Sequence, residues 1–347
     1  MNDLRFINSF AIVVPKQKAE AARRFLLSHN LLRLDLRIKV QDDLIFLPIQ
    51  NRDQSILEEY SIVQTSFEVF KPKPKLHDLV LESLGEEKLP LQSFYSLDVI
   101  GTVGILKIAP QFLTRAKIIA ETIKRHSQCQ HIFLKRGAVE GSYRLPNLVL
   151  IAGNKQTEYT TVHREYGLKI YVDILKTYFN PRLGTEHNRI ASLVSSHEHV
   201  ADLFTGVGPF ALHIAKNAPT KIYAVDINLR AIECLQKSIK LNKKRLKGEI
   251  IPICGEAQNQ NFKNIDRVIM NLPGSALTFL KFIIKYLADS AFIHLYHFDK
   301  DRINVQDQFI KIVENQEYKV SQLKCRILRD VAPYVHQLIV DAQVQRN

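Results

Sequence analysis

The sequence has few cysteines and no long apolar run. Its four cysteines stand at positions 129, 234, 254 and 325 and form no C-x-x-C pair, so neither a zinc site nor a disulfide framework is indicated, and we expect a reducing compartment. No apolar stretch approaches the length that spans a bilayer, and the N-terminus lacks a basic segment followed by an apolar one. These absences predict a soluble, cytoplasmic protein with no membrane partner.

Acidic residues are also in short supply. The chain has 48 Lys and Arg against 35 Asp and Glu, a net charge of +13. This excess favours an acidic partner, of which nucleic acid fits best, although a generally basic cytosolic protein would show the same balance. With 347 residues the chain is long enough for two or three domains, each with its own core.

Composition and periodicity divide the chain into three parts. Residues 1–68 alternate strand and helix signals and predict a small α+β domain. K-P-K-P-K within residues 69–75 indicates a stiff linker, because alternating prolines favour an extended backbone. Residues 76–166 predict a second α+β domain. Residues 167–347 alternate strands with helices, which predicts a Rossmann-like parallel sheet covered on both faces and completed by a helix at 305–315 and one strand at 319–340.

A glycine turn stands at the centre of the third part. In V-A-D-L-F-T-G-V-G-P-F, which runs from position 200 to 210, an apolar strand leads to Gly206 and Gly208, and Pro209 suits the first position of a helix. Twenty residues after Gly206, a second apolar run ends at Asp226, whose carboxylate can accept hydrogen bonds from ribose hydroxyls. This spacing favours a nucleotide-cofactor site over close helix packing, but it also permits a dinucleotide.

A second polar group is expected at the same edge of the sheet. Asn271 follows the strand at 266–270 and is succeeded by Leu272 and Pro273. Proline makes this loop rigid, and the Asn271 amide offers a donor and an acceptor to a planar ring. Asn271 could instead cap the next helix.

A basic loop lies in the second part of the chain. Lys135, Arg136 and Arg144 flank a glycine-containing segment at 137–141. Basic side chains and free backbone amides can hold phosphate there, although a solvated loop has the same composition.

These segments together resemble the archaeal and eukaryotic tRNA (guanine-37-N1)-methyltransferases over nearly the full length. The shared stretches are F-A-I-V-V-P and D-D-L-I-F-L-P in the first part; D-V-I-G-T-V-G-I-L-K-I, H-I-F-L-K-R-G-A-V-E-G-S-Y-R and L-I-A-G in the second; and Y-F-N-P-R-L-G-T-E-H, V-A-D-L-F-T-G-V-G-P-F, V-D-I-N and N-L-P in the third. Each stretch alone is weak, but the set is specific.

The resemblance implies three catalytic residues. Glu186 matches the glutamate that removes the guanine N1 proton, a role for which burial would raise its pKa towards neutrality. Arg144 matches the arginine that stabilises negative charge on guanine O6, and Asn271 would hold the base edge. Without the resemblance, Glu186 would be a carboxylate at a helix N-terminus and Arg144 a phosphate contact.

The resemblance also implies S-adenosyl-L-methionine as cofactor and no metal. The expected cofactor-binding residues are His187, Phe204, Gly206, Gly208, Asp226, Ile227, Glu256, Ala257 and Asn271. The expected substrate-binding residues are Arg144, Lys135, Arg136, Arg182 and Pro273. The sequence departs from the family in two places: Glu256 replaces a usual aspartate, and Gly274 replaces a lysine often seen after N-L-P. The second change makes the base site roomier.

The implied activity is methyl transfer to N1 of guanosine 37 in the anticodon loop of tRNA by a monomer whose first domain reads the outer corner of the tRNA. A roomier base site is also compatible with methylation of 4-demethylwyosine on carbon at the same position. Three alternatives stay open: an aminocarboxypropyltransferase acting on a wyosine precursor, a dinucleotide-dependent oxidoreductase and a non-catalytic tRNA-binding protein.

Overall fold

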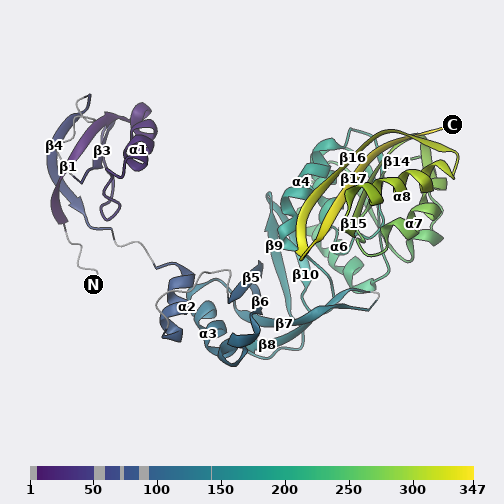
Figure 1. The fold of residues 1–347 in the computed structure, drawn as a ribbon, viewed down its shortest axis with the longest axis horizontal. Helices are drawn as coiled ribbons and strands as arrows, with labels where there is room; N and C mark the ends of the chain where they lie inside the picture. Colours follow the sequence, from purple (N-terminus) through teal and green to yellow (C-terminus); the bar gives the residue numbers. More distant parts are fainter. Residues whose placement is uncertain (1–5, 51–58, 71–73, 86–93, 142) are drawn as a thin grey trace. The chain divides into compact units, whose positions relative to one another are not determined.

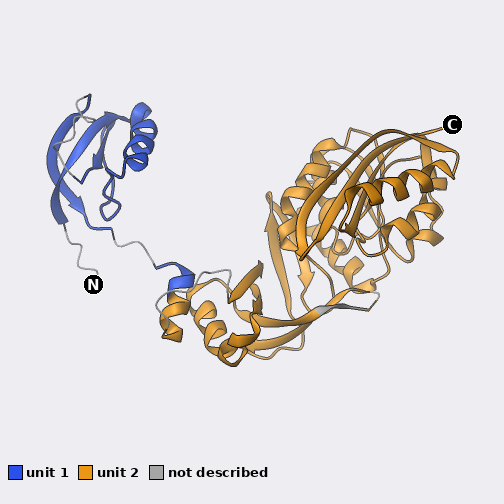
Figure 2. Cartoon of the chain, in the orientation of Figure 1, with its two compact units in different colours: residues 1–78 blue, residues 79–347 orange. Residues whose placement is uncertain are grey.

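The computed structural model describes residues 6–50, 59–70, 74–85, 94–141 and 143–347. The chain forms two compact units, residues 1–78 and 79–347 (Figure 2). The middle of the predicted linker, 71–73, lies outside the described residues. Within the described part of the chain, no helix is both long and apolar enough to cross a membrane. The division into three domains, the cytoplasmic location and the monomeric state stay predictions.

The first unit is an antiparallel sheet with one helix packed on it, in the strand order β2-β3-β1-β4. Its elements are β1 (Phe6–Pro15), α1 (Ala19–Ser28), β2 (Lys39–Gln41), β3 (Leu44–Pro48) and β4 (Ser61–Glu68). Ala22 and Leu26 stand four positions apart on α1, so both face the sheet and pack against Ile12 and Leu47. The predicted α+β character of this segment is confirmed.

The second unit begins with a smaller four-stranded sheet, ordered β5-β6-β7-β8. Its elements are β5 (Tyr95–Ile100), β6 (Val103–Ile108), α3 (Ala116–His126), β7 (His131–Glu140) and β8 (Leu145–Ala152); α2 (Leu76–Leu84) precedes them. The buried Ile119 and Ile123 lie on one face of α3, which packs on β7 and β8. This region is α+β, as predicted.

A separate hairpin follows, and it corrects one prediction. β9 (Thr160–Glu165) and β10 (Leu168–Asp173) pair antiparallel in a two-stranded sheet of their own. The run that forms β10 was expected to open the parallel sheet. It does not, because Tyr166 and Gly167 both take positive φ and turn the chain back onto β9.

The main sheet has seven strands in the order β13-β12-β11-β14-β15-β17-β16. β15, β17 and β16, which Figure 1 labels, lie side by side at one end of this order. Its strands are β11 (His199–Asp202), β12 (Lys221–Asp226), β13 (Glu249–Cys254), β14 (Ile265–Met270), β15 (Leu287–Asp299), β16 (Tyr318–Ala332) and β17 (Val335–Arg346). Its helices are α4 (Gly184–Leu193), α5 (Pro209–Asn217), α6 (Leu229–Asn242), α7 (Ala276–Ile283) and α8 (Arg302–Glu314). The strands from β13 to β15 are parallel.

Both faces of this sheet are buried, as the fold prediction required. Side chains alternate along each strand, so Val200 and Ala201 point to opposite faces. Val200 packs in a core with α4, α5 and α6, and Ala201 packs in a second core with α7 and α8. The Rossmann-like fold class is therefore confirmed for this part of the chain.

The C-terminal segment differs from the prediction of one strand at 319–340. It forms two long antiparallel strands, β16 and β17, and β17 also pairs antiparallel with β15. The turn between them contains Pro333, which cannot donate to a strand ladder, and Tyr334 at φ 60. The sheet is therefore mixed rather than wholly parallel.

Candidate active site

The glycine turn forms as the sequence predicts. β11 ends at Asp202, Gly206 and Gly208 take φ of 56 and 81, and Pro209 is the first residue of α5. Gly208 is the N-cap of α5 and lies against Leu235 of α6, whose side chain occupies the place of a Cβ. The turn therefore holds the N-terminus of α5 close to the edge of the sheet.

Asp226 lies beside this turn at the end of β12. Its Oδ2 accepts the Gly206 N–H at 2.8 Å and its Oδ1 accepts the Asn228 N–H at 2.8 Å. Burial raises the pKa of Asp226, and these two hydrogen bonds oppose the rise. Each oxygen retains a second lone pair, so the carboxylate can still accept hydrogen bonds from a ribose diol.

Asp226 and the turn form one wall of a cavity of about 530 Å³. Nine of the predicted site residues line it: Arg144, Phe204, Gly206, Asp226, Ile227, Glu256, Ala257, Asn271 and Pro273. These residues follow the ends of β11, β12, β13 and β14 or lie in the β7–β8 turn, far apart in sequence. Tertiary folding therefore brings the cofactor signals and the Asn271 loop to one place.

Asn271 occupies the position that its motif predicts. β14 ends at Met270, and Asn271 enters the cavity wall together with Leu272 and Pro273. The capping alternative does not hold, because the N-cap of α7 is Ser275. The Pro273 carbonyl accepts the Phe298 N–H at 3.0 Å, which ties this loop to β15.

Arg144 reaches the same cavity from the turn between β7 and β8. Its φ is 54, a left-handed backbone conformation that is unusual for arginine, and its N–H donates to the Gly141 carbonyl at 3.1 Å. Sparsely populated conformations of this kind concentrate at functional sites. The turn therefore directs the guanidinium towards the cavity that Asn271 lines.

Glu186 is placed differently from the expectation. It lies in the first turn of α4, 4% exposed, and is not among the residues that line the cavity. Arg189 donates to both of its oxygens at 2.7 and 2.9 Å, Arg326 donates at 2.7 Å, and the Tyr296 hydroxyl donates at 2.7 Å. Burial alone would raise the pKa of Glu186, but these donors outweigh it and lower the pKa. The expected rise towards neutrality is wrong.

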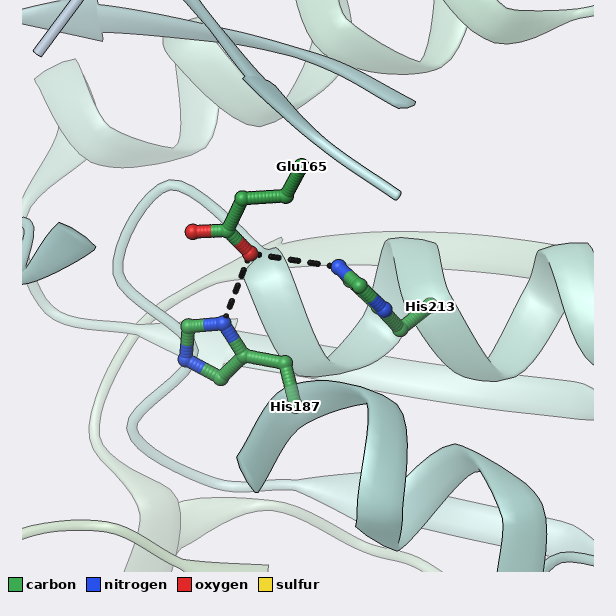
Figure 3. Close-up of side chains that lie close together, drawn as sticks. All are labelled: Glu165, His187 and His213. Carbon is green, nitrogen blue, oxygen red and sulfur yellow. Dashed lines mark hydrogen bonds and ion pairs between the residues drawn. The ribbon is translucent and has the colours of Figure 1, made fainter. Parts of the chain in front are cut away.

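His187 also lies away from the cavity, in a buried cluster with Glu165 and His213 (Figure 3). Glu165 Oε2 is 2.9 Å from His187 Nδ1 and 3.2 Å from His213 Nε2. Within the described ranges, this is a set whose donor atoms are close enough for a metal ion. The distances equally suit two imidazole N–H groups that donate to one carboxylate, which joins β9, α4 and α5. The prediction of no metal stays a prediction.

The other predicted basic residues, Lys135, Arg136 and Arg182, do not line the cavity. Burial and the neighbouring charges of Lys107 and Arg329 lower the pKa of Lys135, while Asp98 opposes them. Arg136 is exposed on the same strand, β7. Arg182 pairs with Asp98 at 2.6 Å and is thereby held against β5.

Several further residues line the cavity and had no predicted role. Tyr178, Phe298, Arg329 and Gln337 are among them. Arg329 Nε donates to Gln337 Oε1 at 2.8 Å across the β16–β17 ladder. Tyr178 belongs to the shared stretch Y-F-N-P-R and could have been selected from the sequence. Arg329 and Gln337 could be selected only if the β16–β17 hairpin was expected, and Pro333 was the sequence signal for its turn.

A buried acid behind the glycine turn gives a pH prediction. Burial and the charge of Asp226 raise the pKa of Asp202 to about 7, while Thr205 donates to it at 2.6 Å. An acid with a raised folded-state pKa destabilises the fold progressively as pH rises from about 4 to 7. Asp202→Asn should therefore gain stability relative to the parent over this range, by up to about 4 kcal/mol, since each pKa unit is about 1.4 kcal/mol.

Urea unfolding of both proteins at pH 5 and pH 8 checks this prediction. The unfolding free energy of Asp202→Asn should exceed that of the parent by more at pH 8 than at pH 5. A difference that is equal at the two values would show that Asp202 is ionised in the folded state throughout.

The fold and the site together define a class I methyltransferase. A Rossmann-like sheet covered on both faces carries the glycine turn, Asp226 and the Asn-Leu-Pro loop around one cavity. Three family models match: the TRM5/TYW2 methyltransferase domain at residues 161–327, the TYW2 N-terminal domain at 76–157 and the tRNA methyltransferase 5 N-terminal domain at 11–57. The chain belongs to the tRNA (guanine-37-N1)-methyltransferase family.

Relatives and solved structures support this assignment over nearly the whole chain. The tRNA (guanine(37)-N(1))-methyltransferase Trm5b of Methanocaldococcus jannaschii is 35% identical, covering 96% of this chain and 98% of that protein. Trm5b of Pyrococcus abyssi is 32% identical, with 97% and 99% covered. The crystal structure of the latter protein superposes with a TM-score of 0.72 at 31% identity, covering 97% of this chain and 99% of the other.

Proposed function

We propose that this protein transfers a methyl group from S-adenosyl-L-methionine to N1 of guanosine 37 in tRNA. The observation that carries the proposal is the single cavity that Asp226, Asn271 and Arg144 share. Two similar structures support it: a complex of aTrm5 with tRNALeu, 34% identical with a TM-score of 0.67, and Methanocaldococcus jannaschii TYW2 in complex with AdoMet, 26% identical with a TM-score of 0.57.

The residues around the glycine turn fit the cofactor. Phe204, Ile227 and Ala257 offer apolar surface to an adenine ring, and Asp226 offers carboxylate oxygens to the ribose. Glu256 lines the same wall, and its Oε2 accepts from Gln258 and Asn259 at 2.9 and 2.7 Å. When bound, S-adenosylmethionine would supply an electrophilic methyl group.

The residues across the cavity fit a guanine extruded from its loop. The Asn271 amide can pair with the base edge, and loss of the N1 proton places negative charge on O6, which the Arg144 guanidinium can stabilise. Arg329 brings a second positive charge to the cavity wall. Positioning and charge stabilisation are therefore supplied by side chains that already meet in the folded chain.

Glu186 remains the proposed proton acceptor, but its hydrogen bonds in this structure must change before it can act. Its low pKa keeps it ionised, but its oxygens are occupied by Arg189, Arg326 and Tyr296. It must exchange at least one of these donors to accept a proton from N1. Leu183, three residues earlier, lines the cavity, so the start of α4 is already at its edge.

Glu186→Gln should lower kcat by about 10²- to 10⁴-fold, the usual contribution of a general base, with cofactor affinity retained. Asp341→Asn is the matched control, because Asp341 accepts from Arg189 at 3.1 Å in the same ion network. Single-turnover methylation measures both. Equal losses in the two variants would mean that Glu186 only maintains the network.

Nucleoside analysis of an unmodified tRNA transcript tests the activity itself. Guanosine at position 37 should yield 1-methylguanosine, and adenosine there should yield no product. S-adenosylhomocysteine should accumulate; methylthioadenosine would instead indicate an aminocarboxypropyltransferase. A relative with that activity is 30% identical but spans only 66% of this chain.

A second substrate is favoured by one observation beside Pro273. Gly274 is exposed, and a Cβ built on it would meet no atom within 4 Å. This space agrees with the roomier base site expected from the sequence. A relative at 28% identity is a tRNA 4-demethylwyosine(37)-methyltransferase. We therefore propose that 4-demethylwyosine at position 37 is also methylated; tRNA carrying it should give a second product, and its absence would exclude this activity.

A further inference from the structure

The β16–β17 hairpin extends past the catalytic cavity. In its register Arg329 pairs with Gln337, and both line the cavity; the next pair outward is Asp330 with His336. Adjacent residues along a strand are about 3.3 Å apart. The tip of the hairpin therefore begins one residue pair beyond two residues that line the cavity.

A second, open depression of about 490 Å³ lies at this tip. Asp330, Val331, Ala332, Pro333, Tyr334 and His336 line it. Tyr334 is 83% exposed and Val331 is 41% exposed. The tip thus presents an aromatic ring and apolar side chains to solvent at a place where the fold does not use them.

We propose that this tip binds an unpaired nucleobase that flanks the methylated guanosine, with the ring of Tyr334 as the stacking platform. The inference rests on the proposed function. A base drawn into the catalytic cavity stays attached to its strand, so its neighbours remain close to the residues that line the cavity, and the tip begins one pair beyond two of these. Every base has a π-face, so stacking on an aromatic ring does not depend on sequence.

The charges around the tip favour a base over a phosphate. His336 Nδ1 is 2.6 Å from Asp330 Oδ1, and the Asp330 side chain is 79% exposed. A carboxylate repels phosphate but accepts hydrogen bonds from exocyclic amines. The charges of Lys107 and Arg329 both lower the pKa of Lys135, and Arg329 lines the cavity, so these three cations suit the phosphates of the same strand.

Tyrosine variants of the full-length protein test the inference with full-length tRNA. Tyr334→Ala should weaken tRNA binding about 5- to 140-fold, since base stacking on an aromatic side chain contributes about 1–3 kcal/mol. Tyr334→Phe should bind within about twofold of the parent, because the ring remains. Tyr166→Ala is the matched control: Tyr166 is 51% exposed and has positive φ in the β9–β10 turn.

A second measurement separates stacking from a structural role. With 2-aminopurine placed on either side of guanosine 37, its fluorescence should be quenched on binding to the parent and to Tyr334→Phe, and not to Tyr334→Ala. If Tyr334→Ala bound tRNA with parental affinity, still quenched 2-aminopurine and still formed 1-methylguanosine, this inference alone would be overturned. The tip would then be a surface for a protein. Failure of the parent to form 1-methylguanosine would instead overturn the proposed function.

Discussion

Arg144→Ala should lower kcat for methylation of guanosine 37 by about 10²- to 10³-fold, the range seen when one fixed donor to a developing oxyanion is removed. The left-handed turn between β7 and β8 holds this guanidinium at the cavity, and truncation to alanine removes it. Steady-state kinetics with saturating tRNA and cofactor measure the effect.

Arg144→Lys distinguishes charge from geometry. It keeps the positive charge but lacks the planar fork, so we expect it to recover only part of the lost rate. Arg136→Ala is the control: Arg136 is exposed on β7, the strand that precedes this turn, and its loss should change kcat less than twofold at saturating tRNA. If Arg144→Ala raised KM for tRNA and left kcat intact, Arg144 would be a phosphate contact.

Gly208→Ala should destabilise the second unit by about 2–4 kcal/mol, since a left-handed alanine costs about 1–2 kcal/mol and overpacking adds a comparable amount. Gly208 has φ 81, and a Cβ there would overlap Leu235 of α6. Because Gly206 N–H donates to Asp226 in the same turn, cofactor affinity should fall together with stability.

Gly274→Ala is the matched control for this substitution. A Cβ at Gly274 meets no neighbour, so its unfolding free energy should stay within about 0.5 kcal/mol of the parent. Thermal unfolding and equilibrium binding of S-adenosylmethionine measure both variants. A Gly208→Ala protein with parental stability would mean that α6 moves freely away from the turn.

Residue types predicted those parts of the site that are formed by a few consecutive residues. Positive φ at Gly206 and Gly208, proline at the first position of α5 and the rigid Asn-Leu-Pro loop each follow from the residue types in place. Spacing along the chain also predicted that Asp226 and Asn271 face the same crevice, because parallel strands bring their carboxyl ends to one edge; they follow β12 and β14, which lie on either side of β11.

The sequence by itself therefore determined the Rossmann-like class, the cofactor turn and the motif set of the family. Only the tertiary structure decided the protonation of Glu186, because its partner Arg326 is 140 residues away and local burial would have predicted the opposite pKa shift. It also decided that β16 and β17 complete the cavity wall with Arg329 and Gln337. Backbone preferences act between neighbours in sequence, whereas charge, burial and cavity shape depend on residues that meet only after folding.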